Sequence, residues 1–187
     1  MKILKKNIEG IFEIIPESHN DFRGFLVRIW DDKIFEEAGL KSKWVQESHS
    51  HTKKKNTVRG FHIQFPPHGE AKLIRVVKGE VKWVVVDMRK NSKTFGQWES
   101  VVLTDKLKNV LYVEKGFANG SITLSDGVDL VIKADNYFNQ ELGTGINWKD
   151  KDLNIKWGLS NGEKPIISER DDNYPSFREF KAKYGGV

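Results

Sequence analysis

The sequence predicts an all-β protein, an antiparallel sandwich or barrel of the jelly-roll type with a few short helices. Short runs rich in β-branched and aromatic residues recur along the chain, separated by clusters of Gly, Asn, Asp and Lys. Turn signals follow one another at intervals of about eight to twelve residues, a spacing typical of such folds. The 187 residues contain 38% apolar residues and show no shift in composition, so we expect residues 1–187 to form a single domain.

The N-terminal part of the chain contains three predicted strands and one helix. The strands are Gly10 to Glu17, Gly24 to Trp30 and Lys43 to His51. The segment from Asp32 to Leu40 has an apolar helical stripe, with Asp32 placed to cap it and Gly39 placed to end it. The first two strands would present exposed apolar edges, which predicts a homodimer with at least one sheet that spans both copies.

The middle of the chain carries the strongest hairpin signal. Ala71 to Val77 and Glu80 to Met88 flank Lys78-Gly79, and the second run is apolar on both faces, which predicts a central strand. Further strands are expected at Gly96 to Leu103, Val110 to Val113, Phe117 to Leu124 and Val128 to Ala134. A short basic helix is expected from Ser176 to Tyr184.

The segment from Thr57 to Phe65 combines strand periodicity with groups that can do chemistry. Apolar residues alternate with His62 and Gln64, so the polar side chains share one face. Gly60 inside the strand predicts a bulge, which would turn Arg59 and His62 to the same side. A fixed cation would then lie beside a group that titrates near neutral pH. The alternative is a hydrogen-bonded core histidine and a surface arginine.

Composition excludes several classes of site. The chain has no cysteine, so it has no disulfide framework, thiolate metal site or cysteine nucleophile. The first residues lack the apolar region of a signal peptide, and no run approaches the roughly 18 apolar residues of a membrane span, so we expect a soluble cytoplasmic protein without a membrane partner. The net charge of +5 suits a polyanion such as a nucleotide diphosphate. No nucleic-acid-binding motif accompanies the Lys53-Lys54-Lys55 run, so no nucleic acid is expected as partner.

Histidine spacing argues against a metal site. No second histidine follows His62 two residues on, and His68 and Glu70 lie in a turn that need not converge on it. His49 and His51 share one face of a strand and are the next candidates, although two neighbouring histidines are more often surface groups. We expect no metal and no cofactor.

Several motifs occur together in the order and spacing of one known family. They are Asp21-Phe22-Arg23-Gly24-Phe25, Gln46-Glu47-Ser48-His49-Ser50, Val58-Arg59-Gly60-Phe61-His62-Ile63-Gln64, Lys72-Leu73-Ile74-Arg75-Val76, Gly79-Glu80-Val81, Val86-Asp87-Met88-Arg89, Ser92-Lys93-Thr94-Phe95-Gly96-Gln97-Trp98, Gly116-Phe117-Ala118-Asn119-Gly120 and Trp148-Lys149-Asp150. From Gly10 to Pro175 the chain resembles the dTDP-4-dehydrorhamnose 3,5-epimerase family. The resemblance implies a cupin-type jelly roll, a metal-free homodimer, and activity on nucleotide-linked 4-keto-hexoses or related sugars destined for surface polysaccharides and natural products.

The resemblance also assigns roles to single residues. Epimerisation beside a ketone needs a base, a donor to the enolate oxygen, and an acid on the opposite face of the sugar. The family's base matches His62, the carboxylate that orients it matches Asp171, and a lysine suited to the enolate oxygen matches Lys72. Arg23 and Arg59 match the cations that hold the diphosphate. The other substrate-binding residues that it implies are Gln46, Glu47, Ser48, Asn119 and Arg170.

Two residues depart from the family pattern. The proton-donating tyrosine falls on Ile132, whose aliphatic side chain cannot give up a proton. The histidine that usually completes the Gly-Phe-Ala motif is Asn119, which can orient a ligand but cannot titrate. Tyr137, five residues after Ile132, has the other strand parity and is expected at the rim.

The sequence is compatible with three functions. The first is an epimerase of a nucleotide-linked 4-keto sugar, acting at C3 alone or at C3 and C5. The second is a sugar-nucleotide-binding protein without turnover, and the third is an isomerase that moves the keto group between C3 and C4. The first is favoured because His62, Lys72 and Asp171 are all present, and a binding protein would need no polarised base.

Overall fold

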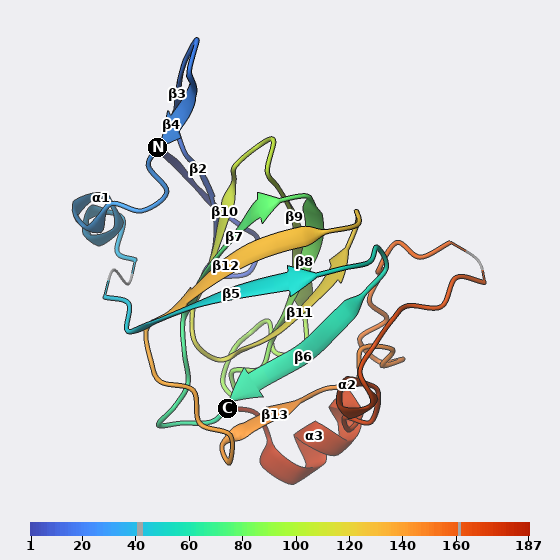
Figure 1. Ribbon diagram of the computed structural model, residues 1–187. Helices are drawn as coiled ribbons and strands as arrows, with labels where there is room; N and C mark the ends of the chain where they lie inside the picture. Colours follow the sequence, from blue (N-terminus) through green and yellow to red (C-terminus); the bar gives the residue numbers. More distant parts are fainter. Residues whose placement is uncertain (41–42, 161) are drawn as a thin grey trace.

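Two antiparallel sheets face each other and form a barrel (Figure 1). The computed structural model describes residues 1–40, 43–160 and 162–187. The six-stranded sheet has the order β1 (Lys2–Lys5), β2 (Ile11–Ile15), β10 (Val110–Val113), β7 (Lys72–Lys78), β12 (Val128–Ala134), β5 (Gln46–Thr52). The five-stranded sheet has the order β13 (Gly143–Gly145), β6 (Val58–Gln64), β11 (Phe117–Thr123), β8 (Glu80–Asp87), β9 (Trp98–Thr104). The predicted all-β, cupin-type jelly roll is confirmed.

The predicted hairpin at Lys78-Gly79 is wrong. β7 pairs with β10 and β12, whereas β8 pairs with β9 and β11 in the other sheet. Ile74 of β7 and Trp83 of β8 belong to the same interior cluster, so the two strands face each other across the core instead of pairing by their edges. Gly79 makes this crossing, with a φ of +84° and its N–H donated to the Asp105 carboxylate at 2.7 Å.

The buried apolar residues of the described chain form three clusters, and β8 contributes to two of them. The inner cluster lies between the sheets and includes Val81 and Val85 of β8. The outer cluster includes Val84 and Val86 of the same strand together with Phe180 of α3 (Phe177–Tyr184), which covers the outside of the five-stranded sheet. β8 is therefore buried on both faces and lies inside its sheet, as its sequence predicted.

The short helices are fixed by local capping. α1 (Asp32–Glu37) is capped by Asp31, whose side chain accepts a hydrogen bond from the Ile34 N–H, so the prediction that Asp32 is the cap is wrong by one residue. Gly39 follows the helix with a φ of +72°, consistent with the predicted stop. α3 begins after a capping box made by Ser176 and Glu179. None of the helices in the described part of the chain is long and apolar enough to cross a membrane.

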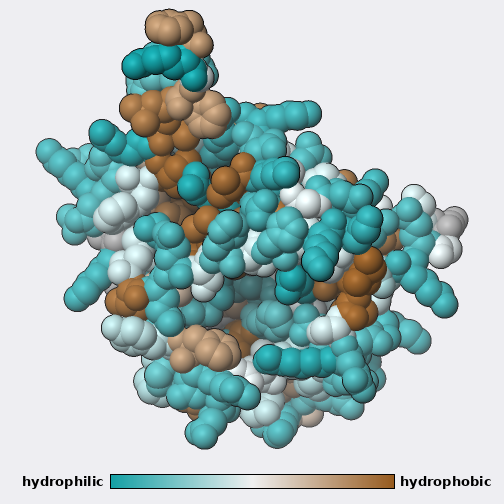
Figure 2. All heavy atoms as spheres, in the orientation of Figure 1, coloured by the Kyte–Doolittle hydropathy of each residue, from teal (hydrophilic) through white to brown (hydrophobic). Residues whose placement is uncertain are grey.

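Of the two strands predicted to have exposed apolar edges, the first is covered and the second is exposed. β2 is covered by β1 on one side and by β10 on the other, so it is not an edge strand. β3 (Ser18–Asp21) and β4 (Gly24–Val27) form a separate two-stranded hairpin that projects from the barrel beside the N-terminus (Figure 1). Phe22, Phe25 and Leu26 of this hairpin are 98%, 60% and 74% exposed. Figure 2 shows apolar side chains on the projecting hairpin and a hollow in the face between β5 and β6.

Candidate active site

A bulge in β6 decides which of its side chains face the barrel interior. On β11, Asn119 pairs with His62 and Ser121 pairs with Arg59, so two residues of β6 lie opposite a single residue of β11. The apolar residues of β6 all belong to the outer cluster, which places Arg59 and His62 together on the inner face. The predicted bulge at Gly60 is therefore confirmed.

Gly60 cannot be replaced at this bulge without strain. Its φ is +93°, and a Cβ atom added there would lie 2.4 Å from the backbone oxygen of Asn119. Its N–H donates to Oδ2 of Asp171, in α2 (Glu169–Asp172), at 2.9 Å. The bulge thus presents His62 and also binds the carboxylate behind it.

His62 and Asp171 form a hydrogen-bonded pair. Nε2 of His62 lies 2.9 Å from Oδ1 of Asp171, and the carboxylate is almost fully buried while the imidazole is about half exposed. Ser168 caps α2 by accepting the N–H of Asp171, which fixes the carboxylate at the first turn. Burial alone would raise the pKa of Asp171, but the bonds from His62 and Gly60 outweigh it and hold this pKa below its ordinary value. Asp171 therefore remains an anion that orients the imidazole and leaves Nδ1 to act on a ligand.

Tyr174 is a neighbour of this pair that the sequence did not single out. Its ring meets the His62 ring edge to face, with centroids 5.9 Å apart. It lies against Gly145 of β13, where an added Cβ would come within 2.5 Å of the tyrosine ring. The Arg170 guanidinium carbon lies 5.7 Å from the Tyr174 ring centroid, and Arg170 itself is exposed on α2. Arg170 therefore lies on α2 beside Tyr174.

The wall that faces His62 is formed by β5, β7 and β12. Residues directly opposite each other on antiparallel strands point to the same face, and Ile132 packs against the inner cluster. Ser48 pairs with Ile132, and both Gln46 and Lys72 pair with Ala134, two residues further along β12. Gln46, Ser48, Lys72 and Ile132 therefore face the interior.

Glu47 does not join its neighbours on this wall. Successive side chains of a strand point to opposite faces, so Glu47 lies outside the barrel, where it forms an ion pair with Lys133 at 3.1 Å. The expectation that Gln46, Glu47 and Ser48 act together is corrected for Glu47.

Asn119 and Arg59, which lie on the same sheet as His62, are both held by hydrogen bonds. Asn119 accepts a hydrogen bond from the indole N–H of Trp83 at 3.1 Å and donates to the Phe117 carbonyl at 3.0 Å. Both ends of its amide are therefore bonded within the five-stranded sheet, which leaves the side chain little freedom to orient a ligand. Arg59 donates from Nε to the Thr52 hydroxyl at 3.2 Å, which connects β6 to β5 on the opposite sheet.

Arg23 lies far from this wall. It sits at the turn of the projecting hairpin and forms an ion pair with Asp21 at 2.6 Å, with three quarters of its side chain exposed. Arg23 therefore does not line the interior of the barrel of its own chain.

The other histidines lie outside the barrel interior. Nε2 of His49 and Nδ1 of His51 lie 3.1 Å and 2.8 Å from the same oxygen of Asp129, on the outer face of β5 and β12. His68 approaches the Tyr137 carbonyl through Nδ1 at 2.9 Å. Across residues 1–40, 43–160 and 162–187, no three His, Cys, Asp or Glu side chains are grouped so as to hold a metal ion.

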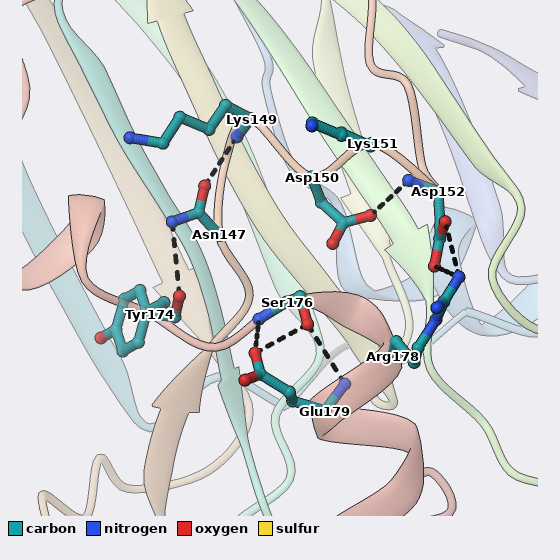
Figure 3. A pocket seen from close by; sticks show the side chains of 9 residues that line it. All are labelled: Asn147, Lys149, Asp150, Lys151, Asp152, Tyr174, Ser176, Arg178 and Glu179. Atoms are coloured by element: carbon teal, nitrogen blue, oxygen red, sulfur yellow. Dashed lines mark hydrogen bonds and ion pairs between the residues drawn. The ribbon is translucent and has the colours of Figure 1, made fainter.

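A second hollow lies on the outside, at the start of α3, and its charged groups are used by the fold (Figure 3). Asp150 accepts the backbone N–H groups of Asp152 and Phe177, and Asp152 forms an ion pair with Arg178. Glu179 belongs to the helix cap. This hollow is therefore a structural junction, distinct from the interior that contains His62.

The interior combines a polarised base on one sheet with a cation on the other. His62 is activated by a buried carboxylate, and Lys72 faces it from β7 with its Nζ 2.5 Å from Oε1 of Glu70. Such a site can take a proton from a carbon beside a carbonyl and stabilise the resulting enolate.

Comparison with known proteins agrees with this chemistry. The sequence model of one family, dTDP-4-dehydrorhamnose 3,5-epimerase, matches residues 5–179. A relative of that name from Shigella flexneri is 39% identical over 178 residues, which cover 95% of this chain and 96% of the relative. The chain belongs to this family.

Solved structures of epimerases have the same fold. A 3,5-epimerase from Legionella pneumophila in complex with dTDP-4-keto-L-rhamnose superposes with a TM-score of 0.90 at 33% identity, covering 97% of this chain and 95% of that one. A 3'-monoepimerase from Streptomyces bikiniensis in complex with dTDP-quinovose also gives 0.90, at 27% identity, covering 98% and 91%. The predicted enzyme class, a nucleotide-sugar epimerase, is confirmed.

Proposed function

We propose that the protein inverts a carbon beside the ketone of a nucleotide-diphosphate-linked 4-keto sugar, with His62 as the base. The hydrogen-bonded pair of His62 and Asp171, open to the barrel interior through the imidazole, carries this proposal. A histidine that only stabilised the core would be buried with both nitrogens satisfied, whereas this imidazole is about half exposed. The family, whose members are dTDP-sugar epimerases by name, supports the same substrate class.

The proposed reaction begins with proton abstraction. Nδ1 of His62 takes the proton α to the ketone, and the Asp171 carboxylate stabilises the imidazolium that forms. The carbonyl oxygen becomes an enolate oxygen, and Lys72 on the facing wall supplies positive charge near it. Return of a proton to the opposite face of the same carbon then inverts the configuration.

Arg59 is proposed to bind the diphosphate. It shares the inner face of β6 with His62 but lies three residues earlier, so a sugar at His62 would leave its diphosphate beside the guanidinium. Gln46 and Ser48 line the facing wall and are proposed to contact the sugar or the nucleotide.

We also propose a homodimer in which the β3–β4 hairpin of one copy packs on the other. Three exposed apolar side chains on a projecting hairpin form an unfavourable surface in a monomer. Arg23 at the turn of this hairpin cannot line its own barrel, so we propose that it serves the diphosphate site of the partner copy. We place the enzyme in the cytoplasm, where nucleotide-activated sugars are made, in the supply of sugars for surface polysaccharides.

Hydrogen exchange tests the function directly. The protein is incubated in heavy water with a dTDP-linked 4-keto-6-deoxyhexose, and proton NMR follows the signals at C3 and C5 as well as the configuration. We expect deuterium at C3 with inversion there. Deuterium at both C3 and C5 would extend the activity to a 3,5-epimerase. No exchange, together with tight binding of the nucleotide, would instead identify a sugar-nucleotide-binding protein.

A further inference from the structure

The wall opposite His62 lacks the acid that inversion requires at its expected position. The family resemblance aligns a proton-donating tyrosine with Ile132, which faces the interior from β12. Across the strand pair Ile132 lies opposite Ile74, and Lys72 lies two residues along β7 on the same face. Such diagonal neighbours on a sheet are about 7–8 Å apart, within reach of a long side chain. The ammonium of Lys72 can therefore occupy the space that a tyrosine at 132 would reach.

Lys72 is also on the correct side of the cavity. β7 belongs to the six-stranded sheet and β6, with His62, to the five-stranded sheet, so the two groups approach a bound sugar from opposite walls. The other inward-facing residues of β5, β7 and β12 near Ile132 are Gln46, Ser48, Ser50, Ile74, Val76, Leu130 and Ala134. None of these has an ionisable side chain, whereas an ammonium and a phenol are proton donors of similar strength in water.

Glu70 gives this lysine a proton-exchange partner. Its Oε1 lies 2.5 Å from Nζ of Lys72, and the two side chains are only 11% and 19% exposed. Glu70 lies in the segment between β6 and β7, two residues before Lys72. A partly buried carboxylate at this distance can pass a proton to the lysine nitrogen.

We propose that Lys72 is the acid that protonates the enolate on the face opposite His62, and that Glu70 reprotonates Lys72. The inference rests on the proposed function. The enolate π pair forms the new C–H bond with a proton of the Lys72 ammonium, and the N–H bonding pair stays on Nζ. The neutral amine then takes a proton that Glu70 has received from water, and the His62 imidazolium gives the abstracted proton to water. Charge and protons are restored at the end of the cycle.

The test separates proton donation from simple charge stabilisation. Lys72→Met is incubated in heavy water with the dTDP-linked 4-keto-6-deoxyhexose, and exchange at C3 is measured beside inversion at C3. If Lys72 is the acid, His62 still removes and returns hydrogen on its own face, so inversion falls at least 10-fold more than exchange. Glu70→Gln should slow inversion by about 10-fold and leave exchange within a few-fold. Parallel loss of exchange and inversion in Lys72→Met would overturn the proposal and leave Lys72 only a role at the enolate oxygen.

Two further variants keep the test decisive. Lys72→Gln replaces Lys72→Met if the latter fails to fold. Adding Ile132→Tyr to Lys72→Met should restore inversion, because a phenol would return to the same wall. Absence of exchange in the unmodified protein would reject the proposed function itself, an outcome distinct from parallel loss in the lysine variant alone.

Discussion

His62 and Asp171 are 109 residues apart in the sequence, and their side chains meet at 2.9 Å. The carboxylate also accepts the N–H of Gly60, two residues before the histidine, so one anion fixes both the imidazole and the bulge that presents it. This double contact connects the local backbone of β6 to the proposed chemistry.

Asp171→Asn should lower kcat by about 10³-fold or more with little change in fold, because a neutral amide cannot stabilise the imidazolium and favours the wrong tautomer. The matched control is Asp172→Asn. Asp172 is the next residue, is partly exposed, and bonds Trp148 and Lys149 on the other side of α2. Steady-state kinetics should show the control within a few-fold of the unmodified protein. Similar losses of kcat in both variants would mean that activity depends on the integrity of α2 and not on the Asp171 carboxylate.

The Asp171 carboxylate should also affect how the free energy of unfolding changes at acid pH. Because the folded-state pKa of Asp171 lies below its ordinary value, the ionised group contributes stability that is fully present above the unfolded-state pKa of about 4. That contribution is lost as the pH falls through the lower folded-state pKa. Urea unfolding between pH 3 and pH 6 should therefore show a steeper pH dependence below pH 4 for the unmodified protein than for Asp171→Asn. Equal slopes would count against an ionised Asp171 in the folded protein.

Gly60→Ala should reduce the free energy of unfolding by roughly 3 kcal/mol and remove most activity, because the new Cβ would meet the Asn119 carbonyl and shift the Asp171 contact. Gly127→Ala is the control. Gly127 also has a positive φ, of +63°, but an added Cβ there has no atom within 4 Å. Its cost should be about 1 kcal/mol from backbone strain alone. Urea unfolding compares the two, and equal losses would show that the close approach at Gly60 is unimportant.

The projecting hairpin should govern assembly. Sedimentation at micromolar concentration is expected to give a mass near twice the 21.6 kDa of the chain. Replacing both Phe25 and Leu26 by Glu should yield monomers, because charge would be placed in the proposed interface. Ile166→Glu, at an apolar residue that is 54% exposed elsewhere, should remain dimeric. A monomeric unmodified protein would reject the proposed position of Arg23.

Local patterns were sufficient to predict much of the fold. The strands at Val110–Val113 and Val128–Ala134 have the predicted bounds, because turn residues flank short runs of strand-forming residues. Which strands pair with each other was harder to predict from the sequence. Lys78-Gly79 has the local chemistry of a hairpin, but two strands that each bury an inner face gain more by facing each other across the core than by pairing.

The site was predictable to different degrees for different residues. Strand parity and Gly60 placed Arg59 and His62 on one face, and the bulge bears this out. The partner of His62 comes from α2, a contact over a separation that no local pattern encodes, so Asp171 was accessible only through family resemblance. No sequence pattern pointed to Tyr174, because its position beside His62 depends on packing against Gly145 of β13.

The central claim, that His62 is the base, is tested most directly by measuring turnover and nucleotide binding side by side in His62→Asn. Asparagine keeps a polar group near Asp171 but cannot take up a proton at neutral pH. We expect turnover of the dTDP-linked 4-keto-6-deoxyhexose to fall at least 10³-fold, while calorimetry with dTDP gives a Kd within a few-fold of the unmodified protein. Loss of dTDP binding in step with turnover would contradict the claim and make His62 a binding or structural residue.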